Sequence, residues 1–234
     1  MRALDRKVLR DIPALRGQVV SIALLIGAGV AVLIMSVSGH LSLSGAQRSF
    51  YAEGRFADIR AEVERAPRAL LARISEIPGV AIVAGRIRGD IRVDWPAAEI
   101  PVVGRILSLP ADGTQPALDR LRLLAGRLPD PTRHDEAVIH AAFAEAWRLR
   151  PGAQIAAILN GRQERFRIVG IAQSPEFVFT SRPGNPLPDD RGFVVLWASQ
   201  ESLARAFDMD GAMGEMALAL APGASEPAVI AELD

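Results

Sequence analysis

The chain has 234 residues with 27 basic and 27 acidic side chains, so its formal net charge at pH 7 is zero. That balance gives no reason to expect nucleic acid as a partner. The chain contains no cysteine, which excludes a disulfide framework, a thiolate zinc site and a cysteine nucleophile. Half of the residues are hydrophobic and no repeat or low-complexity run is present, so we expect the part after residue 40 to fold.

The first element is an apolar segment that is long enough to cross a membrane. Residues 19–37 carry no ionisable side chain, and as a helix with a rise of about 1.5 Å per residue they span roughly 28 Å, close to the thickness of a hydrocarbon core. We therefore predict a transmembrane helix over residues 17–39. A secretory signal usually has a shorter apolar centre of roughly 7–15 residues, but residues 42–46 resemble a cleavage site, so a cleaved signal is the alternative.

Basic residues are concentrated before this segment. The positive-inside rule then places the N-terminus in the cytoplasm and the main domain in the periplasm of a bacterial inner membrane. Residues 1–16 have apolar side chains at helical spacing, which predicts an amphipathic leader on the cytoplasmic surface of the membrane. A merely charged leader that sets the topology is the alternative. The basic residues are Arg2, Arg6, Lys7, Arg10 and Arg16 before the segment, and Arg48 and Arg55 behind it.

Small residues recur on one face of the predicted membrane helix. Ala23, Gly27 and Ala31 are four residues apart, and small side chains let another helix approach closely. We predict that these three residues pack against other membrane helices. The alternative is the ordinary abundance of glycine and alanine in membrane helices.

Residues 40–110 predict the first half of a split α+β domain. After a helical continuation over 41–51, we expect a strand over 58–64, a helix that starts at Pro67, and a strand that starts at Val80. Residues 86–90 are predicted as the turn into a third strand at 91–95, and the run 100–107 as an extension of the sheet. This order is typical of a split β-α-β, ferredoxin-like fold.

Residues 111–190 predict an inserted small β-rich subdomain. Its strongest local signal is Asn160-Gly161 between two alternating runs, because both residues accept the positive φ of a type I′ hairpin. The predicted elements are a strand at 137–140, a helix at 141–149, and strands at 154–159 and 162–171.

Residues 191–234 predict the second half of the split domain, which is incomplete. We expect a strand at 193–197, a helix at 199–207, a strand at 215–220 and a helix after Pro227. The predicted fold class is therefore α+β, with one N-terminal transmembrane helix before an extracytoplasmic domain.

Motifs for catalysis or cofactor binding are absent from the sequence. There is no GxxxxGK[ST] phosphate loop and no GxSxG elbow, and the single lysine, Lys7, precedes the membrane segment. We therefore predict no enzymatic activity, no catalytic residues and no cofactor. An anchored hydrolase would need a nucleophile, a base and an oxyanion site that the sequence does not offer.

Two groups of polar residues could bind a metal or act in acid–base chemistry. His134, Asp135, Glu136 and His140 are potential ligands, but their spacing is not the HExxH that places two imidazoles on one helical face. We therefore predict no metal site. Asp189 and Asp190 are adjacent on a loop, where they are better explained as solvated charges than as an acid–base pair.

Phe177, Val178 and Phe179 form a short apolar run before a proline-rich loop. We consider it a candidate for a loop that contacts a partner or substrate, and burial in the core is the alternative.

Five blocks of the sequence resemble one family. They are RALDRKVLRDIPALRGQVVSIALLIGAGVAVLIMSVS, LLAGRLP, DEAVIHAAFAEAW, LRPGAQIAAILNGRQERFRIVGIAQSPEFVF and GFVVLWASQESLARAF. Their order is similar to that of FtsX-like permeases of ABC transporters, over the first membrane helix and a MacB-like periplasmic core domain. The blocks contain turns and strands and no catalytic signature.

The resemblance implies a cytoplasmic ABC ATPase as partner, a second permease subunit or a homodimer, contact with membrane lipid, and a periplasmic partner or lipophilic substrate. It also implies that ATP hydrolysis drives movement of the periplasmic domain. Members of the family have at least three more membrane helices after this domain, so we expect the chain to be a fragment or a truncated product. The alternative function is a single-span anchored periplasmic binding or scaffold domain that works without an ATPase.

Overall fold

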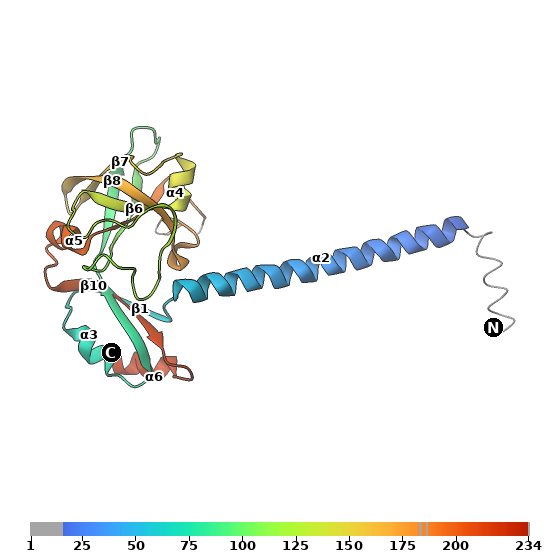
Figure 1. The fold of residues 1–234 in the computed structure, drawn as a ribbon, viewed down its shortest axis with the longest axis horizontal. Helices are drawn as coiled ribbons and strands as arrows, with labels where there is room; N and C mark the ends of the chain where they lie inside the picture. Colours follow the sequence, from blue (N-terminus) through green and yellow to red (C-terminus); the bar gives the residue numbers. More distant parts are fainter. Residues whose placement is uncertain (1–15, 183, 186, 234) are drawn as a thin grey trace. The chain divides into compact units, whose positions relative to one another are not determined.

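The computed structural model describes residues 16–182, 184–185 and 187–233, and the predicted leader lies outside the described residues except for Arg16. The chain divides into two units, Met1–Phe50 and Tyr51–Asp234. We refer to the second as the folded unit, and Figure 1 shows its sheets and helices. Each unit is treated by itself below.

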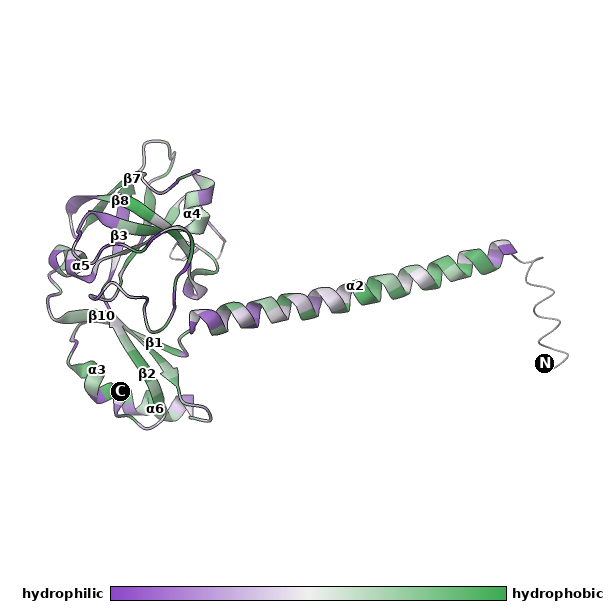
Figure 2. Cartoon of the chain, viewed as in Figure 1, coloured by the Kyte–Doolittle hydropathy of each residue, from purple (hydrophilic) through white to green (hydrophobic). Residues whose placement is uncertain are grey.

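Helix α2 runs without a break from Arg16 to Gly54, which confirms the predicted helix and its continuation. Among the described residues it is the one helix that is long and apolar enough to cross a membrane. Leu25 and Met35 are 75% and 73% exposed. Figure 2 shows that hydrophobic residues dominate the N-terminal half of α2 after its first turn, and that hydrophilic residues are mixed in towards its C-terminal end. This composition suits a lipid environment over the first part of the helix.

The smaller sheet of the folded unit has three antiparallel strands, in the order β1 (Ile59–Pro67), β10 (Ala212–Leu220) and β2 (Val80–Arg86). Helices α3 (Leu70–Ser75) and α6 (Glu226–Leu233) cover one face of this sheet. The apolar core of this layer includes Ile59, Ile74, Met213, Leu218 and Val229.

The larger sheet has seven strands and closes on itself. Its order is β5-β8-β6-β9-β4-β3-β7, and β7 also pairs with β8, so six strands form a closed ring and β5 is attached at its outside edge. The ring closes because β8 is long: its first half pairs with β7 and its second half with β6. The strands are β3 (Arg88–Asp94), β4 (Val102–Ser108), β5 (Arg122–Gly126), β6 (Glu136–His140), β7 (Gln154–Leu159), β8 (Arg162–Gln173) and β9 (Phe193–Ala198).

An apolar core fills the ring, and two helices contribute to it. Phe143 from α4 (Ala141–Ala146) and Leu203 from α5 (Gln200–Phe207) are fully buried in this core. Both helices begin with a side-chain cap: His140 accepts a hydrogen bond from the Ala142 amide, and Ser199 accepts one from the Ser202 amide. The strand residues of the core include Ile91, Val93, Ile106, Ile139, Ile155, Phe166, Ile168 and Leu196.

The predicted hairpin between β7 and β8 is confirmed. Asn160 and Gly161 both have positive φ, 47° and 79°, and Leu159 pairs with Arg162 across the turn. Phe166 and Ile168 on the return strand are both buried, as their alternation predicted.

The strands are grouped differently from the prediction. Only Ile87 separates β2 from β3, so residues 86–90 are not a turn within one sheet but the point where the chain passes from the smaller sheet to the ring. The cause is tertiary, because Ile87 is fully buried in the core of the ring and Gly89 has no side chain where the Phe207 ring packs. The smaller sheet has three strands in the described part of the chain, so the four-stranded ferredoxin-like arrangement is not confirmed.

The ring also takes strands from all three predicted segments. Strands β3 and β4 come from 40–110, β5 to β8 from 111–190, and β9 from 191–234. The predicted insert is therefore not confirmed as a separate subdomain. Pro67 ends β1 instead of starting a helix, and α3 begins at Leu70.

Candidate functional site

The C-terminal end of α2 is held by a short segment that we call the anchor loop, residues 118–121. The Arg120 amide donates to the Gly54 carbonyl at 2.7 Å, and the Asp119 amide donates to the Arg55 carbonyl at 3.0 Å. These bonds satisfy carbonyls that a helix end leaves without an intrahelical partner. The anchor loop therefore takes the place of a helix cap.

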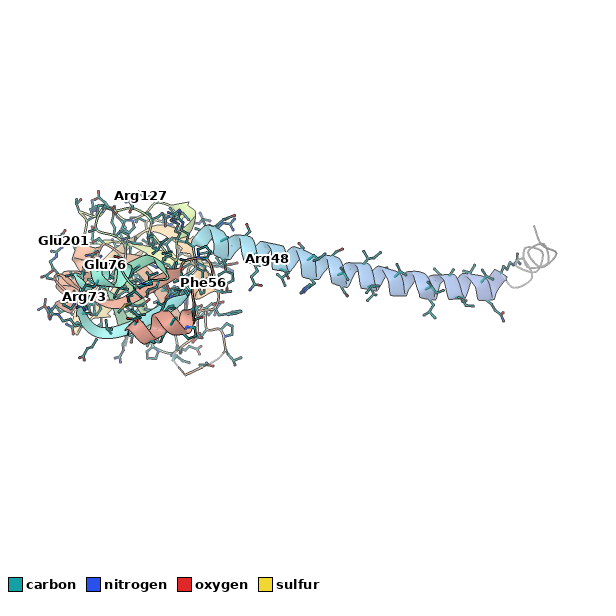
Figure 3. All side chains as sticks on the ribbon, turned by 90° about the horizontal axis from the view of Figure 1, so that it is seen from below. Arg48, Phe56, Arg73, Glu76, Arg127 and Glu201 are labelled. Atoms are coloured by element: carbon teal, nitrogen blue, oxygen red, sulfur yellow. The ribbon has the colours of Figure 1, made fainter. Side chains whose placement is uncertain are left out.

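The Asp119 side chain strengthens the same contact between the anchor loop and the segment that follows α2. It is 3% exposed, and its Oδ1 accepts hydrogen bonds from Arg60 Nη2 at 2.5 Å and from the Ala57 amide at 3.3 Å. Arg60 also stacks over the ring of Phe56, which Figure 3 labels, with 4.7 Å between the guanidinium carbon and the ring centroid. A buried charge is tolerated here because it is paired and hydrogen-bonded.

The last residue of α2 also packs against η1 (Pro175–Phe177), which follows β8. Gly54 is buried, and a Cβ at this position would come within 2.6 Å of the Pro175 ring. Only glycine fits this close approach without a shift of the neighbouring backbone or ring. The helix end is thus enclosed by the anchor loop and by η1.

A cluster of buried charges joins the smaller sheet to η1. Arg86 of β2 is bonded to Glu215 of β10, and its Nη2 lies 2.6 Å from Glu176 of η1. The side chains of Glu176 and Glu215 are 9% and 3% exposed. Arg88 adds a longer contact to Glu215, at 3.9 Å, and pairs with the exposed Glu62. The cluster therefore connects β2, β10, β3 and η1 at one point.

Burial and charge act against each other in this cluster. Burial alone would lower the pKa of Arg86, but the charges and hydrogen bonds of Glu176 and Glu215 raise it overall above its usual value. Burial raises the pKa of Glu215, while Arg86 acts in the opposite direction. Removing one partner of such a group leaves an uncompensated buried charge, so the cluster favours one arrangement of the two sheets.

Three of the four residues considered as metal ligands, Asp135, Glu136 and His140, have other roles, and His134 contributes its backbone carbonyl to a hydrogen bond from Ser202. Glu136 is fully buried and accepts hydrogen bonds from Arg127, Arg167 and the Asp130 amide. The pKa of Glu136 is lowered to about 2, and the largest cause is the hydrogen bonding from Arg127. Arg127 is labelled in Figure 3. In the part of the chain that the structure describes, no group of three or more His, Asp or Glu side chains could hold a metal.

His140 and its neighbours are equally structural. The His140 ring caps α4 and stacks near Phe177 and Trp197, with centroid distances of 6.5 and 6.1 Å. Burial lowers the pKa of His140 to about 4. Asp135 pairs with Arg133 at 3.0 Å.

Asp189 and Asp190 bind different partners, so they do not form an acid–base pair. Asp189 accepts hydrogen bonds from Arg182 Nε at 2.6 Å and from the Gly192 amide at 2.8 Å, and Asp190 accepts one from Thr180 at 2.6 Å. The prediction of solvated charges was incomplete, because both carboxylates brace the loop before β9.

The apolar run 177–179 is divided between core and surface. Phe177 is 8% exposed and packs edge-on to Trp197, with 6.0 Å between the ring centroids. Val178 and Phe179 are 50% and 73% exposed, and Leu187 farther along the same loop is 68% exposed. The partner-contacting role stays a prediction, and it concerns Val178 and Phe179 only.

The predicted packing face of α2 also stays a prediction. Ala23, Gly27 and Ala31 are exposed, and a Cβ on Gly27 would have no atom within 4 Å among the described residues.

The anchor loop and the ion cluster around Arg86 were not predicted from the sequence. The one signal for the cluster was Glu215, a single carboxylate within the apolar strand AMGEMALAL, which needs a buried partner.

Comparison with known proteins supports the family resemblance. The model of the MacB-like periplasmic core domain matches residues 19–234. No curated protein matches the chain.

Three solved structures are similar in fold at low identity. The extracellular domain of the noncanonical ABC-type transporter YknZ from Gram-positive bacteria is 10% identical, with a TM-score of 0.43, covering 71% of this chain and 78% of that one. The periplasmic region of MacB from Actinobacillus actinomycetemcomitans is 11% identical, with a TM-score of 0.44 and coverages of 75% and 72%. A domain of a putative permease protein from Porphyromonas gingivalis is 16% identical, with a TM-score of 0.37 and coverages of 69% and 71%.

These likenesses are too slight to carry an argument about the site. The family model, by contrast, spans most of the chain, from within α2 to the last residue. The chain belongs to the family of MacB-like periplasmic core domains, as its resemblance to FtsX-like permeases of ABC transporters predicted.

Proposed function

We propose that the chain is a permease subunit of an ABC transporter, or the N-terminal part of one, and that it works mechanically. Its N-terminus lies in the cytoplasm, α2 crosses the bacterial inner membrane, and the folded unit lies in the periplasm. ATP hydrolysis by a partner subunit moves the membrane helices, and α2 passes that movement to the folded unit. The movement drives export or extraction of a substrate. The chain itself catalyses no reaction.

The observation that carries this proposal is the way α2 ends. The helix has 39 residues, so it is about 58 Å long, roughly twice the thickness of a hydrocarbon core. Its last residue, Gly54, and the next residue, Arg55, accept hydrogen bonds from the anchor loop. A continuous helix resists bending more than a linker does, so displacement at its membrane end can reach the folded unit.

The proposed partners follow from surfaces that are exposed in the described part of the chain. Ala23, Gly27 and Ala31 would pack against helices of the same permease or of a second copy. Val178 and Phe179 would contact a periplasmic partner or a lipophilic substrate, because exposed apolar side chains that cluster commonly mark such contacts.

The mechanical role can be tested by double electron–electron resonance with the partner ATPase present. The chain has no cysteine, so Arg48→Cys and Arg73→Cys introduce one spin-label pair, on α2 and α3. In a reconstituted complex we expect the distance distribution to shift between the nucleotide-free and ATP-bound states. Both labelled residues are marked in Figure 3. An unchanged distribution, or failure of any ATPase encoded beside the gene to bind, would favour the anchored binding or scaffold domain instead.

The anchor loop provides a matched control for that experiment. Asp119→Ala removes the buried carboxylate that binds Arg60 and Ala57, and should weaken the nucleotide-dependent shift. Asp112→Ala removes an exposed loop carboxylate and should leave the shift unchanged. Equal behaviour of the two variants would contradict the role of the anchor loop.

The packing face is tested separately. Gly27→Leu places a bulky side chain on the face that carries Ala23 and Ala31, and should reduce association with the other permease helices. Gly29→Leu makes the same change about 200° around the helix and should have less effect. Unchanged association of Gly27→Leu would contradict the packing face.

A further inference from the structure

A cavity of about 190 Å³ lies inside the folded unit, between the smaller sheet and the ring. Ala84 of β2 and Ala217 of β10 face each other in the sheet register and form part of one wall. Trp197 comes from β9 of the ring, Leu109 directly follows β4, and Leu118 comes from the anchor loop. The space exists because the paired residues of the smaller sheet are alanines, whose short side chains do not reach the opposite wall.

One donor atom at this cavity has no partner among the described residues. Arg68, between β1 and α3, lines the cavity, and its Nη1 is buried without a hydrogen-bond partner among the described residues. Burial lowers the pKa of Arg68, and no anion in the described chain compensates this effect. A guanidinium nevertheless stays protonated at physiological pH, so the cavity wall carries a positive charge.

The other charges of the lining are already compensated. Arg86 is bonded to Glu176 and Glu215, and Asp119 accepts hydrogen bonds from Arg60 and the Ala57 amide. Arg68 therefore presents a donor at the cavity wall that no acceptor of the described chain uses. An unpaired buried donor is costly, and a ligand that accepts its hydrogen bond recovers that cost.

We propose that this cavity binds a small amphipathic carboxylate, with the carboxylate on Arg68 and an acyl chain among the apolar walls. An apolar cavity of about 150 Å³ can hold benzene, so roughly six to eight carbon atoms fit here. A carboxylate suits the site because it is monoanionic and accepts from guanidinium N–H groups.

The position of the site links its occupancy to the proposed mechanical coupling. Leu118 and Asp119 line the cavity, and the same loop binds the end of α2. A ligand in the cavity contacts the anchor loop directly and restrains it. Binding itself does not depend on the proposed transport function, because every residue that forms the site belongs to the folded unit.

The site can be tested with 8-bromooctanoate, because bromine quenches tryptophan fluorescence on contact. Trp197 lines the cavity, whereas Trp95 and Trp147 pack against the core of the ring. With the full chain in amphipol we expect saturable quenching that octanoate reverses by competition. The quenching should be lost in Trp197→Phe. Linear, non-saturable quenching, or quenching that persists in Trp197→Phe, would overturn the proposal.

The charge requirement is tested without any mutation. On the unmodified chain, 8-bromooctan-1-ol and 8-bromooctylamine should bind at least about tenfold more weakly than the carboxylate, as expected for loss of one charge-assisted hydrogen bond. If the alcohol binds as tightly, recognition of an anion is wrong.

Variants then assign the charge to Arg68. Arg68→Gln should weaken binding about tenfold or more, and Arg68→Lys should retain most of it. The matched control is Arg73→Gln, which removes an exposed arginine of α3 outside the cavity and should change nothing. Ala84→Leu should abolish binding by filling the space. Equal affinities of Arg68→Gln and Arg73→Gln, with both chains folded by circular dichroism, would overturn the assignment.

Discussion

The ring and the region next to it are stabilised in different ways. We call this region the junction; it consists of the end of α2, the anchor loop, η1 and the charged cluster around Arg86. Backbone hydrogen bonds close the ring, and its interior holds fully buried apolar side chains such as Phe143 and Leu196. The junction instead contains an ion cluster around Arg86, a cavity, and the hydrogen bonds of the anchor loop. Close-packed apolar cores resist deformation through packing, whereas a buried ion cluster favours one arrangement because a change of geometry would leave a buried charge unpaired. The ring therefore depends on apolar packing, and the region next to it depends on a few specific polar contacts.

The largest effect is expected inside the ring. Phe143 is fully buried and contacts Trp95 and Trp147, with centroid distances of 6.0 and 6.3 Å. Phe143→Ala should lower the free energy of unfolding by about 3–5 kcal/mol, because the lost burial leaves a cavity. Chemical denaturation of the full chain measures this. The exposed Phe179→Ala is the control, with a change within about 0.5 kcal/mol. Similar losses in both variants would contradict the assigned core.

A smaller effect is expected at the ion cluster. Glu215→Ala removes one of the two carboxylates bonded to Arg86 and should cost about 2–3 kcal/mol, because Glu176 remains as a partner. Glu62→Ala removes an exposed carboxylate that pairs with Arg88, and should cost much less. The same denaturation experiment compares the two. If Glu215→Ala were neutral, the cluster would not hold the two sheets together.

The ring and the junction also differ in how far the sequence predicts them. The β7–β8 hairpin was predictable because Asn160-Gly161 determines its turn locally. Helices α4 and α5 were predictable from their own spacing and boundary residues. The closure of the ring was not, because β8 pairs with three strands whose order depends on tertiary contacts. Strand β5 was missed because its five residues are all exposed and show no alternation of burial.

The junction was the least predictable region, because its contacts join residues far apart in the sequence. Arg86 and Glu215 are 129 positions apart, and Arg60 and Asp119 are 59 apart. No local pattern indicates such pairs. The passage from β2 to β3 through Ile87 was also misjudged, since a run of polar residues around a glycine is typical of a turn but here continues as a strand in another sheet.

A third prediction concerns the helix end. Gly54→Ala should lower the free energy of unfolding by about 1–2 kcal/mol, because the new Cβ would lie 2.6 Å from the Pro175 ring. Gly45→Ala lies in the same helix with no atom within 4 Å of the new Cβ, and should stabilise the helix slightly, since alanine is the better helix former. Thermal unfolding of the two variants should therefore shift in opposite directions. Shifts of the same sign would mean that the packing of Gly54 against η1 is not tight.

The smallest effect at neutral pH is expected from His140, whose protonation makes the stability of the folded unit depend on pH. Burial lowers the pKa of His140 from 6.5 to about 4, against the opposing charge of Asp190, so the folded chain prefers the neutral imidazole. Its contribution to stability is complete above pH 6.5 and is lost as the pH falls towards 4. His140→Asn keeps a side chain that can cap α4 but does not titrate, so stability should fall less steeply between pH 6.5 and 4. Glu136, whose pKa is lowered to about 2, loses its contribution only between pH 4.5 and 2, and the variant should keep that second decline. Denaturation curves collected from pH 7 to pH 2 separate the two windows. An unchanged slope in the upper window would mean that His140 is protonated in the folded chain, and that its ring does not cap α4 as an acceptor.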